Sequence, residues 1–488
     1  MKTALEQLNK ELASLEQALI ETSQKHQKYI EGIPESSQAA ARNLIQYLFF
    51  RSEDRKALQE KLHLYGLSAL SNSENHIHRQ IQVIRERLGH HYKPEELNPC
   101  TYTYSQAQLA ENSRVLFGPP ENQGVPTIMV TFDTGFADDP DLVENLMVQG
   151  MNVARINCAH DDEKVWKAMI DQIREAEKKT GKHCKIHMDL AGPKIRTVLL
   201  GKGKKKGKVK VSVGDTIWLS ENMDHFSEDQ VVLHPNEEGI ISSLVPGHRV
   251  FIDDGEIGGR VTQTENGNAA VVLDRVSSKK GKIKSEKGIN FPDTTFNISS
   301  LTDYDKTCLP FICSHADLIG YSFVKNTGDI RHLRKELQKI GGRRPDLVYQ
   351  IETTDSVANL PALLSEGMMH PPCVIMIARG YLAVEIGFER MGEIQEEILW
   401  ICEAAHVPVV WATQVLENLH KSGMPTRSEI TDAGQAALAE CIMINKGKHT
   451  ISVLKSLKKI MKWTGGRRTK KRFTLSRLSI AENFIQST

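Results

Sequence analysis

The sequence predicts an α/β protein whose largest part is a TIM-type (β/α)8 barrel, with an all-β domain inserted after strand three and an N-terminal helical extension. Short apolar segments alternate with amphipathic helical patterns from about residue 126 onward. One connection in this series is long and rich in β-type segments, and the first 95 residues have helical periodicity. An open, doubly wound sheet is the alternative, because both arrangements are built from strand–helix units.

The barrel is predicted from eight apolar segments of strand length. They are 127–132, 152–157, 184–190, 317–323, 346–351, 373–378, 408–413 and 440–445. Helical patterns lie between them at 138–149, 162–179, 328–340, 355–366, 390–405 and 428–438. Alternating strands and helices form parallel sheets, and eight such units are the number that closes a barrel.

The long connection, residues 198–290, predicts the inserted all-β domain. Its β-type segments are 208–213, 239–245, 248–252 and 269–273. Lysines gather at 202–210, and we interpret them as a solvated hairpin, with a phosphate site as the alternative. We therefore assign 126–197 and 291–463 to the barrel and 198–290 to a lid domain.

The extension, residues 1–95, is predicted to be helical. Five leucines spaced by three and four residues form a narrow apolar seam: Leu5, Leu8, Leu12, Leu15 and Leu19. Further helical patterns cover 36–50, 52–65 and 73–88. A helical bundle or a layer on the barrel suits this pattern, and an oligomerising coil, which would make the protein a homo-oligomer, is the alternative.

Two segments are expected to lie outside the domains. Residues 96–125 are interpreted as a linker, because 92–124 contain four prolines and little periodicity. Residues 464–488 are a basic tail, and the last 38 residues carry ten Lys/Arg against one acidic residue. A solvated tail is the simpler interpretation, and docking on RNA, acidic lipid or another protein is the alternative.

Bulk properties narrow the classes of function. A chain of 488 residues suggests two or three domains, and 40% apolar with 25% charged residues is ordinary for a globular protein. A formal charge of +1 argues against nucleic-acid binding, except through the basic tail, and no apolar run is long enough to predict a membrane span. Eight scattered cysteines without a CxxC pair predict a reduced, cytoplasmic protein without a structural zinc site.

Polar residues gather at the carboxyl ends of the predicted strands, where barrel enzymes place their active sites. In chain order they are Arg155, Asn157, His160, Asp189, Lys194, Arg196, Ser322, Phe323, Lys325, Gln350, Glu352, Arg379, Gly380, Thr413 and Gln414. Most are cationic or hydrogen-bonding, and Asp189 and Glu352 supply carboxylates. Such a rim suits a small anionic substrate held together with a divalent cation.

Five segments over about 126–447 resemble motifs of the pyruvate kinase family, in the same order. They are Gly150–Asn157 (GMNVARIN), Asp189–Thr197 (DLAGPKIRT), Lys287–Pro292 (KGINFP), Trp411–Glu417 (WATQVLE) and Pro425–Glu429 (PTRSE). The resemblance implies a phosphotransferase that converts phosphoenolpyruvate and ADP to pyruvate and ATP with Mg²⁺ or Mn²⁺. Because the chain ends about forty residues after its last strand, we expect it to lack the C-terminal effector domain of that family.

The resemblance implies roles for the residues that act on the substrate. Arg155 and Lys325 would contact the transferring phosphate, and Glu352 would bind the divalent ion. Backbone N–H groups at Arg379 and Gly380 would hold the substrate carboxylate. The methylene carbon that accepts a proton would lie near Thr413.

Further roles concern the nucleotide and the monovalent ion. The nucleotide phosphates would be bound by Asn157, His160, Arg196 and, when the lid closes, Lys287. The potassium cage of the family is incomplete, because Ala159 and Leu190 occupy its hydroxyl positions. Asn157 and Asp189 match the other two positions of the cage, and Lys194 occupies a position where family members with lysine need no monovalent ion, so K⁺ is not expected to be required.

Two departures affect the catalytic positions directly. Gln350 occupies the position of the catalytic lysine, and Tyr381 occupies that of the second aspartate that binds metal. Three hypotheses follow: a potassium-independent and weak phosphotransferase, a pseudoenzyme that binds or regulates a partner, and a metal-dependent lyase acting on a different 2-oxo acid.

Overall fold

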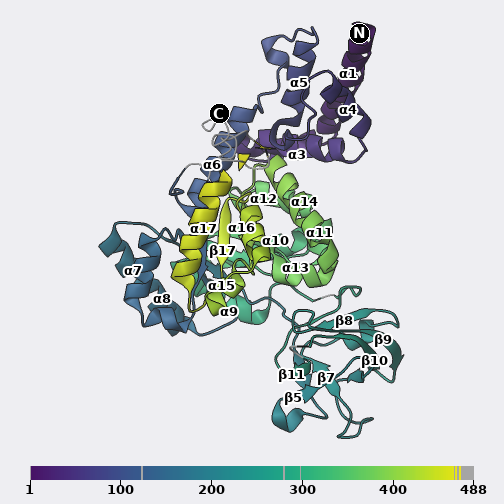
Figure 1. Cartoon of the computed structure of the whole chain (residues 1–488), viewed down its shortest axis with the longest axis vertical. Helices are drawn as coiled ribbons and strands as arrows, with labels where there is room; N and C mark the ends of the chain where they lie inside the picture. Colours follow the sequence, from purple (N-terminus) through teal and green to yellow (C-terminus); the bar gives the residue numbers. More distant parts are fainter. Residues whose placement is uncertain are drawn as a thin grey trace, which may run out of the picture.

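The computed structural model describes residues 2–122, 125–278, 281–296, 298–465, 468–469 and 472–473. Its centre is a closed barrel of parallel strands in the order β1-β17-β16-β15-β14-β13-β3-β2 (Figure 1). The strands are β1 (Thr127–Thr131), β2 (Val153–Asn157), β3 (Lys185–Asp189), β13 (Leu318–Tyr321), β14 (Asp346–Ile351), β15 (Cys373–Ala378), β16 (Val409–Ala412) and β17 (Cys441–Ile444). The predicted fold class and all eight predicted strands are therefore confirmed, and the open sheet is wrong.

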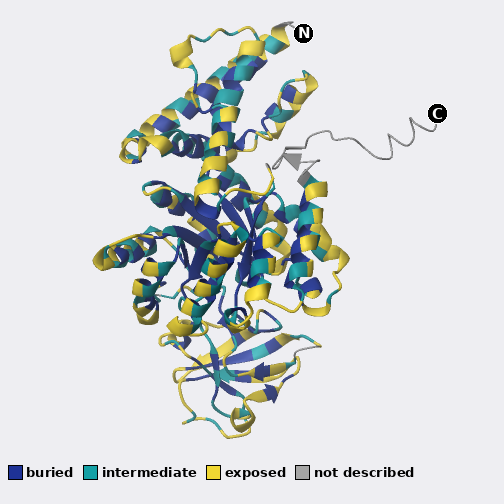
Figure 2. Ribbon diagram, turned by 90° about the vertical axis from the view of Figure 1, so that its left-hand side faces the viewer, coloured by how far each residue is buried: buried dark blue, intermediate teal, exposed yellow. Residues whose placement is uncertain are grey.

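Helices surround the barrel and cover the outward faces of its strands (Figure 2). They are α7 (Pro140–Val148), α8 (Glu163–Thr180), α9 (Asp303–His315), α10 (Thr327–Ile340), α11 (Thr354–Ala358), α12 (Leu360–Met368), α13 (Arg379–Ile386), α14 (Met391–Ala404), α15 (Glu417–Ser422), α16 (Arg427–Ala436) and α17 (Thr450–Gly465). The strands are apolar on both faces because one side packs on these helices and the other fills the barrel.

The expected linker contains a helix that closes one end of the barrel. Helix α6 (Tyr102–Phe117) begins at Thr101, whose side chain accepts a hydrogen bond from the Tyr104 backbone N–H. Its last residues, Leu116 and Phe117, are buried in the barrel interior together with the first residues of several strands. The linker prediction for residues 96–125 is wrong because the prolines flank this helix instead of interrupting it. The carboxyl ends of the strands remain available for a site.

The inserted domain extends from those carboxyl ends (Figure 1). A seven-stranded sheet has the order β12-β8-β9-β10-β6-β7-β4, and β5 pairs with β11. The strands are β4 (Thr197–Leu199), β5 (Lys208–Lys210), β6 (Thr216–Leu219), β7 (Val232–Pro235), β8 (Arg249–Ile252), β9 (Ile257–Glu265), β10 (Asn268–Val276), β11 (Lys282–Lys284) and β12 (Ile289–Asn290). The segment expected as a strand at 239–245 forms a 3-10 helix instead, because the hydroxyls of Ser242 and Ser243 donate to the Gly239 carbonyl.

The N-terminal helices lie at the opposite end of the molecule (Figure 1). They are α1 (Lys2–Lys25), α2 (Gln27–Gly32), α3 (Glu35–Arg51), α4 (Lys56–Leu64) and α5 (Ile77–Arg87). Leu8, Leu12, Leu15 and Leu19 are buried in the apolar core of the chain, where α1 packs on α3 and α5. Helix α3 also packs on α14 of the barrel. The leucine seam is therefore used within the chain, as expected for a bundle layered on the barrel.

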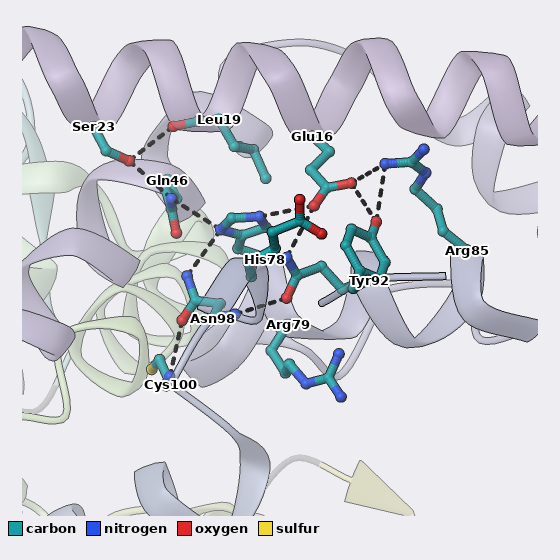
Figure 3. Close-up of polar contacts among 12 residues, drawn as sticks. Glu16, Leu19, Ser23, Gln46, His78, Arg79, Arg85, Tyr92, Asn98 and Cys100 are labelled. Carbon is teal, nitrogen blue, oxygen red and sulfur yellow. Dashed lines mark hydrogen bonds and ion pairs between the residues drawn. The ribbon is translucent and has the colours of Figure 1, made fainter. Parts of the chain in front are cut away.

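A buried polar network joins these helices around Glu16 (Figure 3). The Glu16 carboxylate accepts hydrogen bonds from Arg85, Tyr92 and Gln82, and it lies 3.2 Å from His78 Nε2. Burial by itself would raise the pKa of Glu16, but hydrogen bonds from His78, Tyr92, Arg85 and Gln82 lower it to about 2. The network satisfies a buried charge and fixes α1 against α5.

Most of the expected basic tail, residues 464–488, lies outside the described residues. Among the described helices, none is both long enough and apolar enough to cross a membrane.

Candidate functional site

The centre of the candidate site is Asp189, the last residue of β3. Its Oδ2 accepts a hydrogen bond from Arg155 Nε at 2.5 Å, and its Oδ1 lies 2.5 Å from His187 Nε2. Gln350 Nε2 donates to the same Oδ1 at 2.7 Å. Burial alone would raise the pKa of Asp189, but the charges of Arg155 and His187 lower it to about 2. The neighbouring strand carries Gly320, where an added Cβ would lie 1.8 Å from Asp189 Oδ1.

Sequence reasoning brought Arg155, Asp189 and Gln350 to one rim and missed His187. A signal for this residue exists, because His187 and Asp189 are two positions apart in a strand and so point to the same face. His187 is fully buried, so its role is to hold the carboxylate and not to contact a ligand.

Arg155 lines a cavity of about 240 Å³ at the mouth of the barrel, here called cavity one. Its guanidinium also donates to Thr131 Oγ1 at 3.1 Å, so two strands fix the side chain. Cavity one is lined by Thr131, Phe132, Arg155, Ile156, Asn157, His160, Asp161, Met169, Glu417, His420, Lys421, Asn445 and Lys446. Three residues predicted from strand two, Arg155, Asn157 and His160, thus lie in the wall of one cavity.

Further cations of cavity one were not predicted. Lys421 lies in the last turn of helix α15, and Lys446 follows β17 two residues after its end. Burial lowers the pKa of His160, and the charge of Lys446 lowers it further. The cavity therefore combines a half-buried arginine with two lysines, a set that attracts phosphate oxygens.

Gln350 and Glu352 lie at the end of β14, and both side chains are buried. The Gln350 amide is turned toward Asp189 and contributes no charge. Burial raises the pKa of Glu352 to about 8, the charge of Asp189 raises it as well, and Lys194 and Arg155 oppose the shift. Glu352 is thus a carboxyl group whose charge is only partly compensated.

A second cavity, of about 290 Å³, lies between the inserted domain and the barrel and is here called cavity two. Its lining includes Lys194, Phe323, Lys325, Tyr381 and Glu385. Lys325 Nζ donates to the Ile298 carbonyl at 2.7 Å. The contact of Lys325 with the transferring phosphate stays a prediction, and it would require the ammonium to leave the Ile298 carbonyl, because Lys325 lines cavity two and Arg155 lines cavity one.

Arg379, Gly380 and Thr413 form a closed cluster beside the site. The Arg379 guanidinium donates to both carboxylate oxygens of Asp432, at 2.5 and 2.9 Å, and stacks on Trp411 with 4.7 Å between the guanidinium carbon and the ring centroid. The Arg379 side chain is therefore held by Asp432 of α16, and binding of the substrate carboxylate by the backbone N–H groups at Arg379 and Gly380 stays a prediction. The Gly380 N–H donates to Thr413 Oγ1 at 2.9 Å, so that donor is satisfied within the protein.

Arg196 and Lys287 belong to the junction between the barrel and the inserted domain. Arg196 donates to the Glu286 carbonyl at 3.0 Å, and Lys287 Nζ lies 2.9 Å from Asp253 Oδ1. Neither residue lines cavity one, where the predicted nucleotide ligands Asn157 and His160 lie. A nucleotide contact by Lys287 stays a prediction that requires movement of the inserted domain.

The residues at the expected metal position do not fit a divalent ion held by protein carboxylates. Mg²⁺ and Mn²⁺ need several hard oxygen ligands, but a tyrosine, Tyr381, occupies the position where the resemblance implies the second metal-binding carboxylate. The Lys194 ammonium lies 4.5 Å from the centroid of the Tyr381 ring. No group of three or more His, Cys, Asp or Glu side chains in the described part of the chain could hold a metal.

Comparison with known proteins agrees with this geometry. The family described as pyruvate kinase, barrel domain, matches residues 126–450. The chain belongs to the pyruvate kinase family. Pyruvate kinase of Bacillus licheniformis is 31% identical over 303 residues, which are 62% of this chain and 49% of that protein.

Other relatives give the same result. Pyruvate kinase of Encephalitozoon cuniculi is 33% identical over 309 residues, 62% of this chain and 66% of that protein. A crystal structure of a pyruvate kinase from Cryptosporidium parvum aligns with a TM-score of 0.62 at 24% identity, covering 72% of each chain, and supports the fold. The chain spans about half the length of the pyruvate kinases of Bacillus licheniformis and Staphylococcus saprophyticus.

Proposed function

We propose that this chain is a phosphotransferase of the pyruvate kinase type, which converts phosphoenolpyruvate and ADP to pyruvate and ATP slowly and without K⁺. The observation that carries the proposal is the position of Arg155. Asp189 and Thr131 hold its guanidinium at the wall of cavity one. Phosphoryl transfer depends mainly on such positioned positive charge.

In this proposal the two cavities bind different parts of the reactants. The phosphates would lie in cavity one, with Arg155 at the transferring group and Asn157, His160 and Lys446 toward the nucleotide. Magnesium would enter as part of the nucleotide substrate, because the protein does not supply two carboxylates. Thr413 remains the residue proposed to face the carbon that accepts the proton.

The reaction is expected to be slow because Gln350 carries no charge. Losing one preorganised stabilising group at a transition state costs about 10²–10³ in rate. K⁺ is expected to be unnecessary, because Lys194 brings a fixed ammonium group to the same rim.

The test is pyruvate formation by the purified chain from phosphoenolpyruvate and magnesium-ADP, with and without K⁺. We expect slow turnover that K⁺ does not change and that is lost in Arg155→Met. Turnover that needs K⁺ would contradict the second part of the proposal. A wild-type rate of zero would contradict the first.

A binding or regulatory protein without turnover is the second candidate, and the Gln350–Asp189 hydrogen bond favours it. This bond satisfies a buried carboxylate as a structural glutamine would. The double variant Gln350→Lys/Tyr381→Asp distinguishes the two candidates. Appreciable turnover in that variant, together with none in wild type, would identify a site that has lost its activity.

A further inference from the structure

Two polar groups that have no hydrogen-bond partner among the described residues lie side by side in the wall of cavity two. The Lys194 ammonium is half-buried and forms no hydrogen bond or ion pair with any described residue. The Tyr381 hydroxyl is buried and likewise has no hydrogen-bond partner among the described residues. Buried polar groups are nearly always hydrogen-bonded, so the Tyr381 hydroxyl, which lies beside an ammonium group without a described partner, indicates a place for a ligand.

Both groups lie close to Gly288 of the inserted domain. A Cβ added to Gly288 would lie 3.7 Å from Lys194 Nζ and 3.7 Å from the Tyr381 hydroxyl oxygen. Lys194 Nζ also lies 4.5 Å from the centroid of the Tyr381 ring. The ring is fixed in turn by an edge contact with Phe323, whose centroid is 5.4 Å away. The pair is therefore held rigidly, with N–H and O–H groups left to donate.

The surrounding charges leave the ammonium without a close counterion. Asp254 and Glu352 are the carboxylates whose charges favour the protonated form of Lys194, but neither forms an ion pair with it. Arg196 and Lys287 add further positive charge nearby. A small anion would complete this arrangement, whereas a divalent cation would meet repulsion from the ammonium.

We propose that Lys194 and Tyr381 together bind the carboxylate of the substrate, and that the Lys194 ammonium supplies there the positive charge that a divalent ion would otherwise supply. The ligand class is a small mono- or dicarboxylate that fits beside the aromatic rings of cavity two. The proposal rests on the proposed function only for the identity of that carboxylate. It also gives a role to the contact between the Lys194 ammonium and the Tyr381 ring.

The test is calorimetric titration with oxalate, a small dicarboxylate, in the presence of EDTA. Wild type is expected to bind oxalate without any divalent ion, and added Mg²⁺ is expected to leave the affinity unchanged. Lys194→Met is expected to weaken binding about 10- to 100-fold, the range for losing a charged hydrogen bond, and Tyr381→Phe about 2- to 10-fold. The matched control Lys205→Met removes an exposed lysine of the inserted domain and is expected to have no effect.

A second measurement does not depend on the folding of single variants. Binding of Mn²⁺ without nucleotide, followed by electron paramagnetic resonance, is expected to be absent in wild type and to appear in Lys194→Glu/Tyr381→Asp. The proposal is overturned if wild-type oxalate binding requires a divalent ion, if wild type binds no oxalate at all, or if Lys194→Met binds as wild type does. Oxalate binding in EDTA without any pyruvate formation would remove the phosphotransferase proposal and leave this one standing.

Discussion

Two buried carboxylates in this chain have almost the same partners, and only one of them belongs to a candidate site. Glu16 and Asp189 each contact an arginine, a histidine and a glutamine, and each has a pKa lowered to about 2. The two carboxylates differ in the surroundings of their arginine partners. Arg155 lines a cavity with other cations, whereas Arg85 is covered by Tyr92. Both networks stabilise the fold, but only the network around Asp189 contains an arginine that lines a cavity and is accessible to a ligand.

The comparison is also informative about Gln350. In the N-terminal helices, Gln82 donates to Glu16 and serves only to satisfy a buried charge. Gln350 makes the same kind of bond to Asp189. Gln350, at the position where the resemblance implies a catalytic lysine, is therefore bonded in the same way as a structural glutamine, while Arg155 lines cavity one.

The largest expected effect comes from removing the two arginines in parallel. Arg155→Met is expected to lower pyruvate formation by about 10²–10³, since a positioned cation at the phosphate is lost. Arg85→Met is expected to leave that rate unchanged. Both variants lose about 3–5 kcal/mol of unfolding free energy, because each leaves a buried carboxylate without its charged partner. Urea denaturation and a pyruvate assay on the same preparations measure the two effects, and equal loss of activity in both would break the comparison.

An intermediate effect is expected from acid. The folded-state pKa of Glu16 is below its unfolded value, so this carboxylate contributes stability that is present above about pH 4.5 and is lost as pH falls toward about 2. The slope of unfolding free energy against pH gives the number of protons taken up on unfolding. Between these pH values, that number is expected to be about one lower in Glu16→Gln than in wild type. Denaturant titrations at several pH values measure the slope, and an unchanged slope would mean that Glu16 is not ionised in the folded chain.

The smallest effect is expected from removing the one hydroxyl group that contacts the arginine in each network. Tyr92→Phe and Thr131→Val each remove one hydroxyl that contacts the arginine, at 2.9 and 3.1 Å respectively. Each variant is expected to lose about 1 kcal/mol of unfolding free energy. Only Thr131→Val should raise the KM for phosphoenolpyruvate, because only Thr131 orients an arginine that faces a cavity. A KM shift of the same size in Tyr92→Phe would show that the two networks are coupled.

The strands and the central site residues could be predicted because their signals are local. Each strand is a short apolar run, and Arg155, Asp189 and Gln350 follow from the rule that barrel strands deliver functional residues at their carboxyl ends. Helix α6 escaped prediction because its apolar residues pack into the barrel floor, a contact made by strands far along the chain. The prolines around it were the stronger local signal and were misleading.

The sequence by itself determined the barrel, the inserted domain and the set of side chains at the barrel mouth, because periodicity and strand ends are properties of neighbouring residues. Only the tertiary structure decided which of these side chains are free to act. Arg379 is bound by Asp432, 53 positions away, and Lys325 by a backbone carbonyl. Arg155 lines cavity one, and Lys194 meets Tyr381 within the barrel, beside the junction with the inserted domain. Hydrogen-bond partners are chosen by distance in space, and that distance is set by the packing of the whole chain.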